Sequence, residues 1–590
     1  MIMNFDLEYV PFSRRGSFFA FSKNTENGKV VIRNVEFAMS SRHIFEIELT
    51  RDGNPVSYTV QASPESLKLI PCGEVAESSK QISCGKVSES SNANSDPGFA
   101  EFIISDAKTL RFRGTGVEVR LSVKTTDYDY VASFDEKKKL LTYATGNTKF
   151  MMIPLQDTSM KVDAPWEVSR CTGIVFDFTP GENQVVEGVI DNFSTEWVEK
   201  DFSQTSFDQD RSGVLLDYQN WFAKSTANCY PDYPDGCELA SYITWSCMVP
   251  PLGNLTRNAM YMSKNWMASI WSWDNCFNAL GLATTFPELA LEQFLIFFDH
   301  QNEFGAFPDY INDVECIWSF NKPPIQGLFL NEILQKTGDR VLDEKVLEEI
   351  YKPLCRWTDW WFTYNDYNHN GIPQYKHGND CGWDNSTVFH NGVPLESPDL
   401  LSFLILQLEF LGLVAKRLGK TKESQQHYKA AQEKLDLLIE NFWTEEGFVA
   451  RHNDGSVCST GDSLLLFMPI ILGKRLPDHI REFLISGLKE EGRFLTEYGF
   501  ATESVKSPYY KANGYWRGPI WAPSTFLMVR GLEACGEVDF AKEIKKRFCA
   551  LCNRSGMAEN FNALTGKGLC DRAFTWTSSV FLVFARDLSE

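Results

Sequence analysis

The sequence predicts a mainly α-helical fold: an (α/α)6 toroid preceded by an N-terminal antiparallel β-sandwich-like domain. Three observations support this prediction. The 590 residues exceed what a single hydrophobic core usually supports. Short β-rich segments fill the first third of the chain, and apolar residues recur every three or four positions in the rest. We place the boundary between residues 205 and 206, which gives domains 1–205 and 206–590.

The expected strands each cluster or alternate β-branched and aromatic residues between turn-forming stretches. The clearest segments are residues 30–40, 43–50, 56–60, 100–105, 117–125, 139–146 and 173–180. Between the third and fourth lies a Ser-rich stretch, about residues 71–99, with a short imperfect duplication, CGEVAESS and CGKVSESS. We expect this stretch to be an exposed loop or hairpin with little functional weight.

Helical periodicity starts near Asp208, with the clearest runs at residues 287–301, 343–364, 397–419, 422–443 and 539–554 among roughly twelve. Ser397 and Pro398 fit the cap and first turn of one helix, and Gly419 fits its end. The longer loops between helices hold nearly all the Trp, Asn and Gly residues, and function concentrates in such loops. The helix number also permits a solenoid, but this clustering favours a closed toroid.

Net charge and composition limit the kinds of partner that the protein is expected to bind. The formal net charge of −21 argues against nucleic acid or an anionic membrane and favours a small neutral molecule. The sequence shows neither an export signal nor 18 uninterrupted apolar residues, so no membrane span is expected. The 15 scattered Cys residues suit free thiols in a reducing compartment, so we expect a cytoplasmic protein. The oligomeric state is not predicted.

Several common catalytic signatures are absent from the sequence. It contains no phosphate-binding GxxxxGKS, no dinucleotide-binding fingerprint, no HExxH and no GxSxG. Cys549 and Cys552 form a lone CxxC without a second pair or a His at ligand spacing, which favours structural thiols over zinc. Nucleotide, zinc and nucleophilic-serine chemistry therefore lack support.

Two carboxylates lie in sequence surroundings that suit a sugar. Asp384 lies in GNDCGWDNS and Glu559 in AENFNALTGKG, each beside aromatic, Gly and amide residues. Aromatic rings cover the apolar face of a pyranose, and hydrolysis of its glycosidic bond needs two carboxyls. Trp383 and Gly382 would desolvate Asp384 and keep it protonated, whereas the polar loop around Glu559 suits an ionised base. Considered alone, each could equally be an ordinary solvated loop residue.

Five motifs in order extend this interpretation. They are IWSWDNCFNALGLA, GNDCGWDNS, ESPDL, GYWRGPIW and ENFNALTGKG. Over residues 240–590 the chain resembles glycoside hydrolase family 63, which shares its helical toroid with the trehalases. The resemblance implies that Asp384 is the general acid and Glu559 the general base of an inverting mechanism. Inversion needs carboxyls roughly 6.5–9.5 Å apart so that a water fits between the base and the sugar.

The remaining motif residues are predicted to bind substrate. Asp274 would accept bonds from sugar hydroxyls, Arg517 would add a cation, and the Trp rings would form walls. The predicted set is Trp271, Trp273, Asp274, Trp383, Trp516, Arg517, Trp521 and Trp576, with Phe307, Asp309 and Trp318 as a looser match. Core packing is the alternative for each ring, and an ion pair with a loop carboxylate is the alternative for Arg517.

A calcium site is a separate hypothesis. Asp366, Asn368, Asn370 and Gly371 follow the first half of a calcium loop, but His377 stands at its twelfth position, which excludes an EF-hand. Some relatives that the chain resembles hold calcium in a comparable loop with a Glu from elsewhere, which implies Glu396 here. The alternative is a metal-free turn rich in Asn and Asp.

These inferences predict an inverting, exo-acting α-glycosidase, specifically an α-glucosidase that hydrolyses a small α-glucoside or oligosaccharide without a required cofactor. Three alternatives stay open. They are a trehalase-like hydrolase, an inverting phosphorylase that uses phosphate in place of water, and a non-catalytic carbohydrate-binding protein. The sequence does not define the glycosidic linkage or the aglycone.

Overall fold

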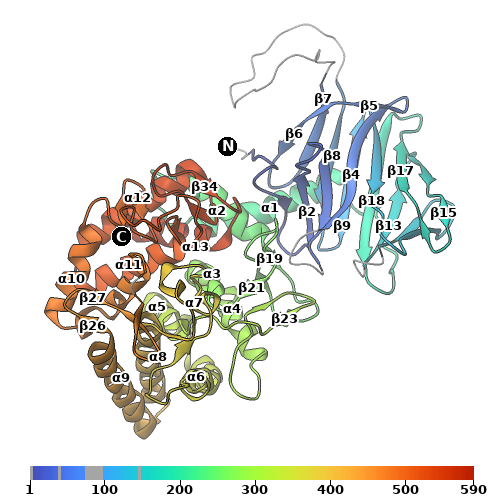
Figure 1. The fold of residues 1–590 in the computed structure, drawn as a ribbon. Helices are drawn as coiled ribbons and strands as arrows, with labels where there is room; N and C mark the ends of the chain where they lie inside the picture. The colour runs from blue at the N-terminus through green and yellow to red at the C-terminus, as the bar shows by residue number, and fades with distance from the viewer. Residues whose placement is uncertain (1–3, 37–41, 73–96, 144–147, 459, 590) are drawn as a thin grey trace. The chain divides into compact units, whose positions relative to one another are not determined.

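The computed structural model describes residues 4–36, 42–72, 97–143, 148–458 and 460–589. The chain forms two compact units, Met1–Asn220 and Trp221–Glu590 (Figure 1). The division falls inside helix α1, Phe207–Ser225, which begins just after the boundary expected at residue 205. Each unit has its own core and is described by itself.

The N-terminal unit is a sandwich of two antiparallel sheets (Figure 1). One sheet has the order β1-β2-β3-β4-β10-β17-β14, with β5 paired to β4: β1 Phe12–Ser13, β2 Phe19–Lys23, β3 Val30–Asn34, β4 Arg42–Arg51, β5 Asn54–Val56, β10 Glu118–Val123, β14 Ser159–Asp163 and β17 Ile174–Thr179. The other has the order β11-β12-β13-β18-β9-β8-β7-β6: β6 Tyr58–Ala62, β7 Leu67–Pro71, β8 Phe99–Ile104, β9 Thr109–Thr115, β11 Tyr130–Ser133, β12 Lys139–Tyr143, β13 Thr148–Pro154 and β18 Val185–Phe193.

Aromatic pairs join the inner faces of these sheets. Phe45 of β4 meets Phe150 of β13 with ring centroids 5.5 Å apart, and Phe112 of β9 meets Phe178 of β17 at 5.0 Å. Every predicted β segment contains a strand, although β2, β9, β13 and β18 were not singled out from the sequence. Residues 73–96, most of the Ser-rich stretch, lie outside the described residues.

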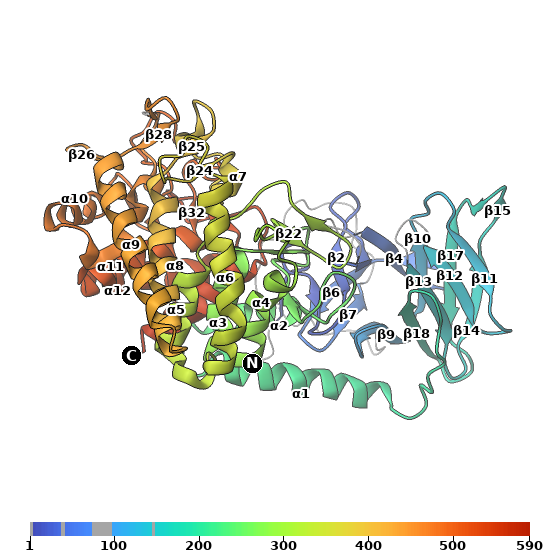
Figure 2. The same ribbon diagram turned by 90° about the horizontal axis from the view of Figure 1, so that it is seen from below.

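The C-terminal unit is a closed double ring of helices, as the fold prediction requires. Six inner elements contact one another in a circle: α3 Asp274–Ala283, α5 Gln326–Thr337, α8 Pro398–Arg417, η4 Leu464–Arg475, α11 Ala522–Cys535 and α13 Thr575–Asp587, which returns to α3. Outer helices pack around them: α2 Pro234–Ser246, α4 Pro287–Asp299, α6 Glu344–Tyr364, α9 Thr421–Phe442, α10 Asp478–Lys489 and α12 Val538–Ser555. Figure 2 shows α5, α6, α8 and α9 running side by side.

Hydrophobicity separates the two rings. All residues of α3 are buried, including the polar Asp274, Asn275 and Asn278, whereas α9 buries a single stripe. Helix α8 is long and apolar enough to cross a membrane by composition, but 89% of its apolar window is buried inside the protein. It is the core helix between α5, α6, α9 and η4.

One inner position is not an α-helix. Residues Leu464–Arg475 form a 3₁₀ segment that contains Pro469 and bends at Gly473, where φ is +55°. Proline removes a helical hydrogen bond, and any side chain at Gly473 would collide with Ala534. The ring closes here through packing on α8 and α11 rather than through a regular helix.

Candidate active site

The predicted motifs converge because all of them precede inner helices. Trp271 and Trp273 precede α3, Asp384 lies before α8, Trp516 before α11 and Glu559 before α13. Inner helices of a toroid run in the same direction, so these loops share one end of the barrel. Asp384 and Glu559 are far apart in the sequence, but inner and outer helices alternate between them. Each such pair of helices returns the chain to the same end of the barrel.

Short two-residue strands fasten these loops in pairs. Strand β21, Ile270–Trp271, pairs with β22, Tyr310–Ile311, which sets the WSWDN loop beside the loop that carries Asp309. Strand β32, Ile520–Trp521, pairs with β33, Asn560–Phe561, and places the YWRGPIW loop beside Glu559. The motifs are thus fixed by backbone pairing as well as by side-chain packing.

Asp384 follows the short helix α7, Gly378–Cys381, and a glycine turn. Gly382 adopts φ +75°, and a side chain there would collide with the ring of Trp273. The Asn379 side-chain amide, oriented to donate, places its nitrogen 2.5 Å from Oδ1 and 3.0 Å from Oδ2 of Asp384. Burial raises the pKa of the Asp384 carboxyl, although the charge of Lys322 acts in the opposite direction. Burial thus acts in the direction that a general acid requires.

Glu559 is a buried carboxylate held by a tyrosine. The Tyr515 hydroxyl donates to Glu559 Oε1 at 3.0 Å, and the Asp571 backbone N–H lies 3.4 Å from Oε2. Burial, followed by the charge of Asp571, raises the pKa of Glu559 to about 7. A carboxyl with this pKa takes and releases a proton near neutral pH, as a general base must.

Tyr515 was not predicted, although it lies inside the GYWRGPIW motif. Its own pKa is raised well above the ordinary value by burial and by the charges of Glu559 and Asp384, so it remains a donor. Asn385 was missed as well. Its side chain bonds Gly514 O at 3.1 Å and Trp516 N at 3.0 Å, which joins the Asp384 loop to the Tyr515 loop. Both could have been found by their position next to motif residues.

Five of the seven predicted tryptophans form one buried cluster. The ring of Trp516 stacks on Trp383 at 4.8 Å and on Trp521 at 4.0 Å between centroids. Trp273 and Trp576 pack at its edges, with Trp576 5.4 Å from Trp521. All five are almost fully buried, so the cluster offers little open ring surface to a sugar.

A second charged group lies beside Asp384. Asp309 Oδ1 is 3.3 Å from the Lys322 ammonium, which also donates to Asn379 O at 2.8 Å. Burial alone would lower the pKa of Lys322, but the charges of Asp309, Asp384 and Asp274 outweigh it and raise that pKa. Lys322 was not predicted, because the sequence places it in a loop, NKPP, without motif character.

Asp274 is the buried first residue of α3. Its Oδ2 is buried and makes no hydrogen bond to any described residue. Burial raises the pKa of Asp274 to about 8. An unpaired buried oxygen is costly, so a hydrogen bond from a ligand hydroxyl would stabilise this atom.

Three predicted residues are placed differently from the rest. Phe307 is 0% exposed and packs between Phe298 and Trp357, so its ring has no face open to a ligand. Trp318 is 41% exposed, and Trp271 packs on Tyr310 with centroids 5.3 Å apart. Phe307 therefore follows the core-packing alternative.

Arg517 and Asp384 line a cavity of about 250 Å³, together with His377, Asn385, Thr387 and His390. Arg517 makes no ion pair with a described residue, and its Nε is buried without a hydrogen-bond partner among them. The alternative of a loop carboxylate holding Arg517 thus finds no partner in the described part of the chain.

The predicted calcium ligands gather in part. The Asn368 and Asn370 side-chain amides lie 2.7 and 2.8 Å from Glu396 Oε1. Asp366 instead accepts the backbone N–H groups of Asn370 and Gly371, as in a metal-free turn. Buried oxygens are nevertheless at hand, since Gln374 Oε1 has no partner among the described residues and Gln374 Nε2 lies 3.3 Å from Glu396. Among the residues that the structure describes, no group of three or more His, Cys, Asp or Glu side chains is placed to hold a metal ion, so calcium stays a prediction.

Comparisons with known proteins agree with the family resemblance. The model of the mannosylglycerate hydrolase MGH1-like glycoside hydrolase domain matches residues 267–577, just over half of the chain. A mannosylglycerate hydrolase of Thermus thermophilus is 21% identical over 54% of this chain and 94% of the relative. A glucosylglycerate hydrolase of Mycolicibacterium hassiacum is 22% identical over 58% of this chain and 97% of the relative.

Solved structures resemble the chain over part or all of its length. A bacterial glucoamylase complexed with acarbose superposes with a TM-score of 0.61 at 10% identity, covering 100% of this chain and 95% of that chain. The family 63 mannosylglycerate hydrolase from Thermus thermophilus, complexed with Tris and D-glycerate, has a TM-score of 0.51 at 17% identity, covering 60% and 99%. The five ordered motifs, the closed helical ring and the family match lead to one conclusion: this chain is a glycoside hydrolase of family 63, of the mannosylglycerate hydrolase MGH1-like type.

Proposed function

We propose that the protein hydrolyses a small α-linked glycoside with inversion, with Asp384 as general acid and Glu559 as general base. The observation that carries this proposal is the environment of the two carboxyls. Each is held by its own donor, the Asn379 amide or the Tyr515 hydroxyl, and each raises the pKa of Tyr515 through its charge. No direct bond joins the two carboxyls among the described contacts, which agrees with a sugar and a water lying between them.

The reaction follows from these positions. Ionised Glu559 removes a proton from a water molecule, and the water oxygen attacks the anomeric carbon from the face opposite the leaving group. Asp384 gives its proton to the glycosidic oxygen as the bond to the anomeric carbon breaks. The products are the free sugar with inverted configuration and the aglycone alcohol. Asp384 and Glu559 then exchange a proton through solvent to restore the starting state.

The size and charge of the cavity beside Asp384 favour a small anionic aglycone. Its volume of about 250 Å³ lies below the range of about 300–1,000 Å³ common for ligand sites, which suits a group smaller than a second sugar ring. Arg517 supplies a fixed positive charge there, and planar guanidinium groups bind carboxylates through two parallel bonds. The relatives that hydrolyse mannosylglycerate and glucosylglycerate act on substrates of this kind.

We therefore narrow the expected α-glucosidase to a hydrolase of an α-glycoside of glycerate or a similar small hydroxy acid, with glucose or mannose as the sugar. A phosphorylase is the second candidate, because Arg517 and the nearby imidazoles of His377 and His390 would also hold inorganic phosphate. Release of sugar that depends on phosphate, with a sugar phosphate as product, would favour this second candidate. A trehalase-like activity would appear as trehalose hydrolysis in the same assay.

The test is substitution of the two carboxyls. Asp384→Asn and Glu559→Gln should each lower kcat on glucosylglycerate or mannosylglycerate by roughly 10²–10⁴-fold or more, because proton transfer is lost while shape is kept. Circular dichroism and the melting temperature should stay close to those of the unchanged protein. Near-normal turnover in either variant would contradict the assignment, and no turnover of any glycoside by the unchanged protein would support a binding protein instead.

A further inference from the structure

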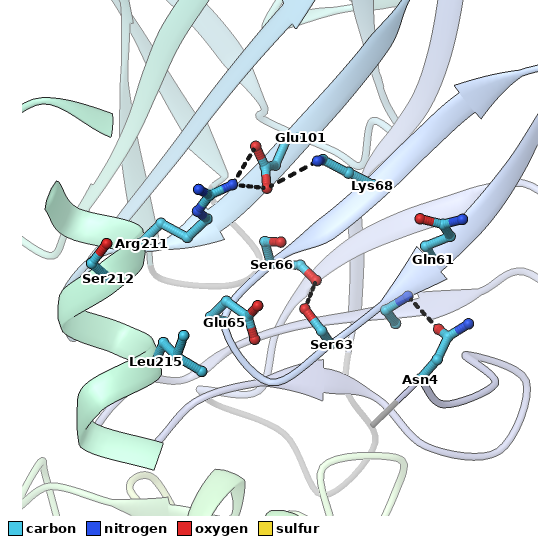
Figure 3. A pocket seen from close by; sticks show the side chains of 11 residues that line it. Asn4, Gln61, Ser63, Glu65, Ser66, Lys68, Glu101, Arg211, Ser212 and Leu215 are labelled. Atoms are coloured by element: carbon cyan, nitrogen blue, oxygen red, sulfur yellow. Dashed lines mark hydrogen bonds and ion pairs between the residues drawn. The ribbon is translucent and has the colours of Figure 1, made fainter. Parts of the chain in front are cut away.

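The N-terminal unit contains a cavity of about 610 Å³ (Figure 3). The hairpin of β6 and β7 forms one side, and residues 211–215 of helix α1 form the other; all of these lie within Met1–Asn220. Its polar lining includes Asn4, Gln61, Ser63, Glu65, Ser66 and Ser212. The volume lies within the range of about 300–1,000 Å³ typical of small-molecule sites.

Glu65 is the polar group that points to a ligand. The residue is only 9% exposed, and its Oε2 is buried without a hydrogen-bond partner among the described residues. Its turn is rigid, since the Ser63 backbone N–H and hydroxyl both donate to Ser66 O, at 3.0 and 3.1 Å. A buried carboxylate oxygen without a donor is unfavourable, so this one is poised to accept hydrogen bonds from a bound molecule.

Each cation of the cavity already has a carboxylate partner. Arg211 Nη1 lies 3.1 Å from Glu101 Oε1, and Lys68 Nζ lies 3.9 Å from the same carboxylate (Figure 3). Arg113 binds Glu101 from the other side at 3.3 Å. With these charges paired to Glu101, the cavity offers no unpaired cation from the described residues to an anionic ligand. Phosphate or a carboxylate is therefore disfavoured.

The remaining lining groups both donate and accept. Asn4 Oδ1 accepts the Ala62 N–H at 2.9 Å, which leaves its NH₂ group to donate. The Ser212 hydroxyl donates to Asp208 O at 2.7 Å and keeps its lone pairs for accepting. Gln61 offers a donor and an acceptor in one side chain. Hydroxyl groups match such a mixture, because each can donate to Glu65 and accept from an amide.

We propose that this cavity binds a small neutral saccharide, at a site separate from the hydrolytic centre. The site goes beyond the hydrolytic activity, because it lies in the β-sandwich unit and its second carboxylate, Glu101, is bound by Arg211 and Arg113. Its contribution would be to hold a sugar on the β-sandwich unit. Glu65 is the residue on which binding depends most.

Isothermal titration calorimetry on the full chain tests the proposal. The Asp384→Asn background prevents turnover, and maltotriose, mannobiose and trehalose serve as probes. Ser212→Trp fills the cavity from an exposed position of α1, and Gln219→Trp places the same ring on the same helix outside the lining. Glu65→Gln keeps the shape of the acceptor and removes its charge.

The background protein should bind at least one probe at a site that Ser212→Trp abolishes and Gln219→Trp preserves. Glu65→Gln should weaken that site by roughly tenfold, as expected for loss of a charged acceptor. Equal binding by the background and the Ser212→Trp and Glu65→Gln variants would overturn the proposal. Inorganic phosphate and spermidine serve as charged probes. If Ser212→Trp abolishes the binding of either one and leaves the binding of every sugar unchanged, the assignment to a neutral saccharide is overturned. Unchanged melting temperatures in all variants exclude misfolding as the cause.

Discussion

Replacing Tyr515 with Phe removes one oxygen atom from the site and with it the hydrogen bond to Glu559. The bond joins Tyr515 Oη to Glu559 Oε1 at 3.0 Å, and it lowers the pKa of Glu559 against the larger effect of burial. The Tyr515 ring would keep its packing on Trp521, where the centroids are 4.8 Å apart. The change is therefore nearly confined to the stability of the ionised carboxylate.

The size of the effect follows from the bond. A hydrogen bond to a charged group contributes about 1.5–3 kcal/mol. One pKa unit corresponds to about 1.4 kcal/mol, so the pKa of Glu559 should rise by about one to two units. The base must be ionised to act, so raising its pKa moves the acidic limb of the rate profile to higher pH. Activity should thus fall strongly at pH 7.

The assay is kcat/KM against pH, which reports ionisations of the free enzyme. The unchanged protein should show a rising limb with an apparent pKa near 7, in line with the pKa of Glu559. Tyr510→Phe is the matched control, because that hydroxyl is buried without a partner among the described residues. An unshifted limb in Tyr515→Phe would show that Glu559 does not govern the rate.

Two further predictions concern the aglycone and the metal. Arg517→Met should raise KM at least roughly tenfold for a glycerate glycoside and leave KM for an uncharged aryl glycoside nearly unchanged, because a charged hydrogen bond is lost only with the glycerate. Steady-state kinetics checks this, with the exposed Lys511→Met variant as control. Equal losses on both substrates would contradict the prediction. Calcium in about one equivalent should survive dialysis and raise the melting temperature, and Glu396→Gln should abolish both effects; elemental analysis that finds no calcium, with no effect of chelator on melting, would remove the prediction.

The toroid could be predicted because its determinants are local. Residues 397–419 carry cap, apolar periodicity and terminal glycine together, and the structure forms α8 over Pro398–Arg417. The 3₁₀ segment at 464–475 could not be predicted in the same way. Its Pro469 and the bend at Gly473 oppose helix formation locally, and only packing against α8 and α11 holds it in the inner ring.

The site was predictable to the extent that its residues lie in motifs. Asp384, Glu559, Asp274 and the Trp cluster are at the barrel end where the loops meet. Lys322 and Tyr515 were missed because their roles arise from contacts between loops, with Asp309 in one case and Glu559 in the other. The burial of Phe307 has the same origin, since its partners Phe298 and Trp357 come from α4 and α6.

Proton NMR of the first sugar released tests the central claim most directly. If Glu559 activates water on the face opposite Asp384, an α-linked substrate must give the β anomer before mutarotation sets in. Appearance of the α anomer first would mean retention, and it would contradict the assignment of Asp384 as acid and Glu559 as base.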